Sequence, residues 1–133
     1  MNGKYSYREI AHEDLLAAGE MLKARLNNHA VRLCQQYVEK ILKECLSINS
    51  ADEADIYLLH THKLVRLAER CKILTKVLFS DAEIMLLHEL TDYYFDANYP
   101  GENYLKVSAE RALAIYDQVV QFKENYEELL CTK

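Results

Sequence analysis

Apolar side chains recur along most of this chain at intervals of three and four residues, the spacing that places them on one face of an α-helix. Five segments show the pattern: 7–26, 30–48, 64–78, 81–97 and 105–129. Asn27 and Asn28 separate the first two segments, and asparagine suits a helix end in the left-handed conformation as well as a new helix start. No stretch alternates convincingly between apolar and polar residues as a half-buried strand does. The pattern therefore predicts four long helices, one shorter helix and no strand.

Capping boxes mark where some of these helices begin. In a Ser-x-x-Glu box the Ser hydroxyl accepts from the third helical amide, and the Glu side chain accepts from the amide of the Ser. The three boxes are Ser6 with Glu9, Ser50 with Glu53, and Ser80 with Glu83. The box at Ser50 lies in the polar connection 49–55 and indicates a short helix there. With short loops between helices, the predicted fold class is all-α, an antiparallel up-down four-helix bundle with an additional short helix.

Length and composition agree with one soluble domain, predicted to span residues 1–133. Half of the residues are hydrophobic and 28% are charged, the balance of a globular protein. Three Gly and one Pro supply too little turn chemistry for a many-stranded sandwich or barrel. No apolar run is long enough to span a bilayer, and the first ten residues lack the apolar region of a signal peptide. We therefore expect a cytoplasmic protein with no membrane contact.

The distribution of charge is more informative than the net charge of −5, which argues against a general nucleic-acid coat. Residues 61–80 carry five basic side chains and one acidic one, whereas residues 81–104 carry six acidic side chains and no Lys or Arg. Two explanations remain open. The two segments can complement each other across a helical hairpin, or Lys63, Arg66 and Arg70 can form a basic ridge that binds phosphate or an acidic partner.

Four cysteines are present, Cys34, Cys45, Cys71 and Cys131. They form no CxxC pair and have no His at zinc-finger spacing, so we predict no metal site and no cofactor. The first three lie within apolar helical series, where a free Cys behaves as a small hydrophobic residue. They are predicted to be reduced thiols in the core.

Three stretches, taken in order, resemble one family. QQYVEKILKECL (35–46), LLHTHKLVRLAERC (58–71) and DYYFDANYPGENY (92–104) are similar to successive motifs of HEPN domains (higher eukaryotes and prokaryotes nucleotide-binding). The resemblance extends over nearly the whole chain and implies an up-down four-helix bundle with an added helix. It also implies a homodimer, contact with a nucleotide or RNA, and association with a small nucleotidyltransferase, including in toxin–antitoxin pairs.

Many HEPN proteins are metal-independent ribonucleases that use an Arg followed, after four to six residues, by a His. In that chemistry the His moves a proton near neutral pH while the Arg stabilises the charge of the phosphate. No Arg of this chain has a His at that spacing; Arg8 with His12 and Arg25 with His29 are each one residue short. The resemblance therefore implies the non-catalytic branch, a binding or antitoxin-type subunit with no catalytic residues.

The family pattern Ala-Arg-Tyr-Pro reads Ala-Asn-Tyr-Pro here, with Asn98 in place of the Arg. Asn supplies neither the charge nor the bidentate fork of a guanidinium. Two alternatives to the binding subunit stay open. One is a ribonuclease with a degenerate site built from His62, Asn98 and Tyr99, and the other is a helical protein-interaction module without nucleotide contact.

Seven residues are candidates for ligand binding: His62, Lys63, Arg66, Arg70, Tyr94, Asn98 and Tyr99. Each has a structural explanation beside the functional one. His62 can cap or pack against a helix, and the tyrosines can form core or dimer contacts instead of stacking on a base. Lys40 and Lys43 match the lysines of the family's second helix, and the spacing of Glu39 and Lys43 also suits an ion pair on a solvated face.

Overall fold

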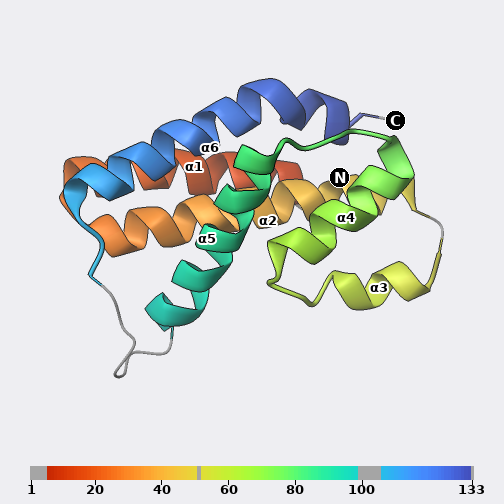
Figure 1. Ribbon diagram of the computed structural model, residues 1–133, viewed down its shortest axis with the longest axis horizontal. Helices are drawn as coiled ribbons and strands as arrows, with labels where there is room; N and C mark the ends of the chain where they lie inside the picture. The colour runs from red at the N-terminus through yellow and green to blue at the C-terminus, as the bar shows by residue number, and fades with distance from the viewer. Residues whose placement is uncertain (1–5, 51, 99–105, 133) are drawn as a thin grey trace, which may run out of the picture.

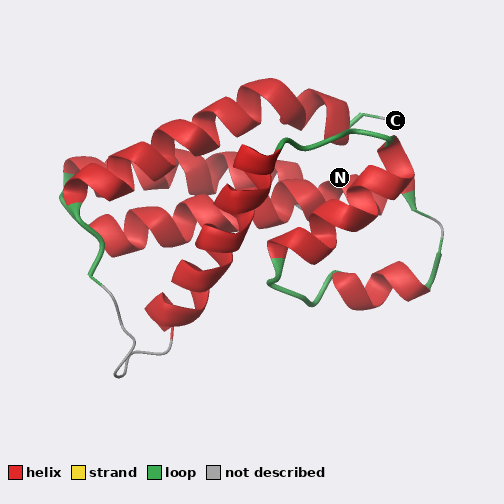
Figure 2. Ribbon diagram, in the orientation of Figure 1, coloured by secondary structure: helices red, strands yellow, loops and turns green. Residues whose placement is uncertain are grey.

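The computed structural model describes residues 6–50, 52–98 and 106–132, and within these ranges it contains helices and no strand (Figures 1 and 2). The helices are α1 (Tyr7–Lys23), α2 (Asn27–Asn49), α3 (Ala54–Leu58), α4 (Leu64–Thr75), α5 (Asp81–Asn98) and α6 (Ala109–Leu130). The predicted all-α fold is confirmed. None of the helices in the described ranges is both long and apolar enough to cross a bilayer.

Helix α2 lies at the centre and contacts α1, α4, α5 and α6. Figure 1 shows α6 lying along α1 and α2, with α5 crossing α2 at a steep angle. Two apolar series run along α2, one through Cys34, Tyr37 and Ile41 and the other through Val31, Val38 and Leu42. They explain this position, because a helix that is apolar on most sides is stable only when it is covered on most sides. Its largest fully buried apolar side chains are Tyr37, Ile41, Leu42 and Val31. All four cysteines are buried free thiols, as expected for core positions.

Two of the three capping boxes form. Glu9 N donates to Ser6 Oγ at 3.1 Å, and Glu83 N donates to Ser80 Oγ at 3.4 Å. The predicted box at Ser50 is wrong: Ser50 ends α2, and its hydroxyl contacts Asp52 and Asp55 instead. A short helix does lie in this connection, but it begins at Ala54, three residues after the start that an N-cap at Ser50 would give.

The ends of two further helices also differ from the prediction. Helix α4 ends at Thr75 rather than residue 78, because Lys76 adopts the left-handed conformation and the Thr75 hydroxyl accepts from Val77 N. Leu78 therefore lies exposed after the helix. Helix α6 begins at Ala109 rather than near residue 105, with Ser108 as the N-cap that accepts from Arg111 N at 3.1 Å.

The turn between α1 and α2 uses Arg25, not an asparagine, as its left-handed residue, with φ of 62°. Leu26 N donates to Met21 O and Arg25 N donates to Leu22 O, the pair of bonds that closes a Schellman motif. Asn27 and Asn28 instead bond the main chain of Val107, at 3.3 and 2.8 Å. The two asparagines thus tie this turn to the segment that leads into α6.

Arg25→Gly is expected to stabilise the protein by about 0.5–1 kcal/mol. Glycine removes the Cβ strain of a left-handed residue, although the more flexible unfolded chain offsets part of the gain. Urea unfolding followed by far-UV circular dichroism measures the effect. Arg25→Ala is the matched control, because it removes the same exposed charge and keeps the Cβ. An equal gain in both variants would show that charge, rather than backbone strain, is responsible.

Candidate functional site

The site begins with a line of polar residues on the otherwise apolar α2. Gln35, Glu39 and Lys43 are spaced by four residues and therefore share one face of the helix. Gln35 Nε2 donates to Glu39 Oε1 at 2.9 Å, and Lys43 Nζ donates to Glu39 Oε2 at 3.0 Å. The predicted Glu39–Lys43 ion pair is present but does not lie on a solvated face: only 5% and 8% of the two side chains are exposed.

His62 reaches this buried carboxylate from the connection between α3 and α4. Its Nδ1 lies 2.9 Å from Glu39 Oε1, and its ring stacks on Tyr94 of α5 with centroids 4.5 Å apart and planes 26° apart. The imidazole is thus held between α2 and α5 while 40% of the side chain stays exposed. Within the described part of the chain, Nε2 has no hydrogen-bond partner.

Lys63 and Arg66 follow His62 at the start of α4. Both are exposed, and neither forms an ion pair with any residue that the structure describes. The N-cap Lys63 gives no side-chain cap, and Leu64 N at the start of α4 donates to Thr91 Oγ1 at 3.3 Å. The next amides of the first turn, those of Val65 and Arg66, have no side-chain acceptor in the described chain. Two cations, an imidazole and a helix N-terminus therefore adjoin one another, a combination that suits an anion.

Arg70 does not belong with these cations. Its Nε lies 2.8 Å from Asp55 Oδ1 and its Nη2 lies 3.8 Å from Asp52 Oδ2. Burial by itself would raise the pKa of the Asp55 carboxyl, but the Ser50 hydroxyl and Arg70 lower it overall. Arg70 thus ties α4 to the start of α3, and its charge is already matched by carboxylates.

Among the described side chains, no ion pair joins α4 to α5, so the predicted complementarity is not seen there; the side chains of Asp96 and Glu102 lie outside the described residues. Two acidic side chains of α5 contact α6 instead. Glu89 accepts from Arg111 Nε at 2.8 Å, and Glu83 accepts from the Tyr126 hydroxyl at 3.0 Å. Of the remaining candidates, Asn98 is the last residue of α5, and its side chain and Tyr99 lie outside the described residues.

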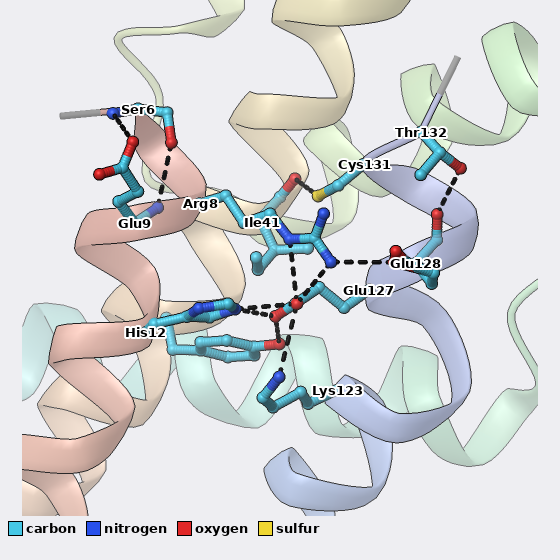
Figure 3. Close-up of polar contacts among 11 residues, drawn as sticks. Ser6, Arg8, Glu9, His12, Ile41, Lys123, Glu127, Glu128, Cys131 and Thr132 are labelled. Carbon is cyan, nitrogen blue, oxygen red and sulfur yellow. Dashed lines mark hydrogen bonds and ion pairs between the residues drawn. The ribbon is translucent and has the colours of Figure 1, made fainter.

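A second polar cluster surrounds Glu127, which the sequence interpretation did not single out (Figure 3). From α1, Arg8 Nη2 lies 3.0 Å and His12 Nε2 lies 2.8 Å from Glu127 Oε2. The buried Tyr37 hydroxyl of α2 donates to Oε1 at 2.7 Å, and Lys123 Nζ lies 3.4 Å from Oε2. Burial raises the pKa of Glu127, but the hydrogen bonds from Tyr37, His12 and Arg8 outweigh it and lower the pKa to about 2.

Arg8 and His12 are four residues apart and so share a face of α1, which brings both to one carboxylate. The Arg8 guanidinium is neutralised by Glu127 and Glu128, and His12 Nε2 is within hydrogen-bond distance of Glu127. An Arg that is to stabilise a reacting phosphate needs an available charge. This cluster joins α1, α2 and α6, and its geometry favours a structural role over a ribonuclease pair.

With this geometry in view, comparison with known proteins identifies the family. A family model for the HEPN domain matches residues 5–126. The chain belongs to the HEPN family. The match includes α1–α5 and most of α6, so the family resemblance inferred from three motifs is confirmed over nearly the full length of the chain. Searches of curated proteins and of solved structures found no match.

Proposed function

We propose that this HEPN-domain chain is a non-catalytic subunit that binds the phosphate of a nucleotide or RNA at the surface formed by His62, Lys63 and Arg66. One observation carries the proposal: the His62 ring is fixed between Glu39 and Tyr94 beside two exposed cations that no described carboxylate neutralises. Tyr94 adds an aromatic ring, and the first turn of α4 adds the main-chain amides of Val65 and Arg66.

The positions and contacts of the arginine and histidine residues support the non-catalytic assignment. None of the six arginines has a His at the spacing of the family's ribonucleases. Of the two pairs that are one residue short, Arg8 and His12 are both bound by Glu127. The runner-up is a ribonuclease that uses His62 with Asn98 and Tyr99. A nucleotidyltransferase-domain partner, an antitoxin-type role and a homodimer belong to the same proposal, and they rest on the family resemblance.

The phosphate site is tested by calorimetric titration of the protein with ATP, GTP and short single-stranded RNA. Lys63→Ala/Arg66→Ala is expected to weaken binding because it removes two phosphate contacts. For RNA, the slope of log affinity against log salt should become shallower by about 1.4, since each contact with a single strand contributes about 0.7. Arg70 is left unchanged, because its removal would break the ion pair with Asp55.

The matched control is Lys23→Ala/Arg32→Ala, which removes the same charge from exposed positions near the α1–α2 turn. It is expected to keep both the affinity and the salt slope. Equal losses of affinity in the two double variants would show that net charge alone explains the effect, and would contradict phosphate binding at this site. The same samples, incubated with labelled RNA, test the runner-up: cleavage that disappears in His62→Ala would establish the ribonuclease instead.

A further inference from the structure

A groove runs between α1 and α6, which lie side by side in Figure 1. It forms an open cavity of about 490 Å³. The apolar part of the lining is Leu15, Leu16, Tyr116 and Val120, and the polar part is His12, Lys123 and Glu124. Leu16 is 74% exposed, so much of this apolar surface meets solvent in the isolated chain. The phosphate site uses none of these residues.

The groove has its own apolar series on α6, distinct from the one that faces the core. Leu113, Tyr116 and Val120 recur at intervals of three and four, beside the buried series that includes Ile115 and Val119. Leu113 is exposed and the other two residues of the first series are half-buried. Of this second series Tyr116 also packs against the core, whereas Leu113 and Val120 are not part of the core cluster. These last two side chains are therefore available to another molecule.

Gly19 brings the two walls of the groove close together. A Cβ at this position would lie 3.2 Å from the Tyr116 hydroxyl oxygen, so the absence of a side chain lets the phenol ring rest against α1. Tyr116 is thereby fixed in the lining. The groove is a defined feature of the packing between α1 and α6.

The rim of the groove is acidic. Helix α1 carries four acidic and two basic residues, and α6 carries five acidic and two basic, an excess of five negative charges that equals the net charge of the whole chain. The basic residues are engaged: Arg8 and Lys123 with Glu127, Lys23 with Glu20, and Arg111 with Glu89. By contrast, Glu124 of the groove lining and Glu13, which follows the lining residue His12, are exposed and form no ion pair within the described chain.

We propose that this groove binds a cationic amphipathic helix of a partner protein. Apolar side chains of that helix, spaced by three and four residues, would enter the cavity, and flanking Lys or Arg would meet Glu13 and Glu124. The acidic rim disfavours a nucleic acid. A symmetric contact with a second copy would place this acidic surface against itself, which like-charge repulsion opposes.

The test uses the full chain and labelled synthetic helices, followed by fluorescence anisotropy. The probe is an amphipathic Leu/Lys peptide with Leu at every third and fourth position, and its counterparts are a Leu/Glu peptide of the same pattern and a scrambled Leu/Lys peptide. We expect saturable binding of the patterned Leu/Lys peptide alone. Leu16→Gln should weaken it by about tenfold, the effect of losing 1.4 kcal/mol of apolar contact.

Two controls locate the binding. Met85→Gln alters a residue on α5 that is 72% exposed, nearly as much as Leu16, and should leave the peptide affinity unchanged. Lys63→Ala/Arg66→Ala should also leave it unchanged, which separates this groove from the phosphate site. Glu13→Lys/Glu124→Lys should reverse the preference in favour of the Leu/Glu peptide. Circular dichroism spectra confirm that each variant is folded.

Several results would overturn the proposal. Equal affinity for the patterned and scrambled Leu/Lys peptides would show that net charge, and not the apolar face of a helix, explains the interaction. Unchanged affinity in Leu16→Gln would place the binding elsewhere. A dimer in light scattering that Leu16→Gln dissociates would assign the groove to a second copy of the chain instead of a cationic partner.

Discussion

Glu39→Ala is expected to lower the free energy of unfolding by about 3–5 kcal/mol, the usual cost of removing one partner from a buried ion pair. The variant leaves the Lys43 ammonium buried without a counter-ion and the Gln35 amide without its acceptor. It also frees His62, which loses its contact on α2. Urea unfolding followed by far-UV circular dichroism measures the loss of stability. Weaker phosphate binding should accompany it.

The double variant Glu39→Leu/Lys43→Met tests whether the loss of stability comes from the unpaired Lys43 charge or from the loss of the Glu39 side chain. Replacing both members of a buried ion pair by apolar residues of similar volume is often close to neutral. We expect it to recover about half of the stability, since the Gln35 amide still lacks an acceptor. If Glu39→Ala lowers the free energy of unfolding by less than about 1 kcal/mol, water reaches Lys43 and the ion pair is not buried in solution.

Glu127→Ala is the second large effect, with an expected loss of about 3 kcal/mol. It removes the acceptor of the fully buried Tyr37 hydroxyl and the carboxylate that ties Arg8 and His12 of α1 to α6. Glu128→Gln is the matched control, because the neighbouring Glu128 also binds Arg8 but is 71% exposed. That control should cost less than about 0.5 kcal/mol.

The same carboxylate predicts a pH dependence. Its pKa falls from 4.5 in the unfolded chain to about 2 in the folded one, so its stabilising effect is complete above pH 4.5 and disappears as the pH falls to 2. The wild type should therefore lose stability across this interval. Glu127→Gln should lose less over the same interval, because it carries no titrating group there. Parallel declines in the two proteins would contradict the assignment of this shift to Glu127.

The helices were predictable because their signal is local. The spacing of apolar residues located every long helix, and both apolar series of α2 anticipated its central place. The helix ends were harder, since competing caps act within a few residues: Ser108 and the left-handed Lys76 decide two of them. Arg25 in a position that favours Gly is a case in which packing overrides the preference of a single residue.

The candidate site was predictable only in part, because its parts are joined over long stretches of sequence. His62 and Tyr94 were both singled out and do meet, whereas the burial of Glu39 depends on how α2 is covered. Glu127 had no signal of its own, since one Glu among several on an amphipathic helix resembles a solvated residue. Its partners Arg8 and His12 lie more than a hundred residues away in the sequence.

The two buried carboxylate clusters restrict α2 in a way that its apolar surface does not. Because α2 is apolar on most sides, burial alone would tolerate a rotation about its axis or a slide of about 5.4 Å, one turn. Tyr37 and Glu39 are two residues apart and point to nearly opposite sides, toward Glu127 and His62 respectively. Either movement would separate both from their partners at once. The polar contacts thus select one register for a helix that apolar packing alone would leave ambiguous.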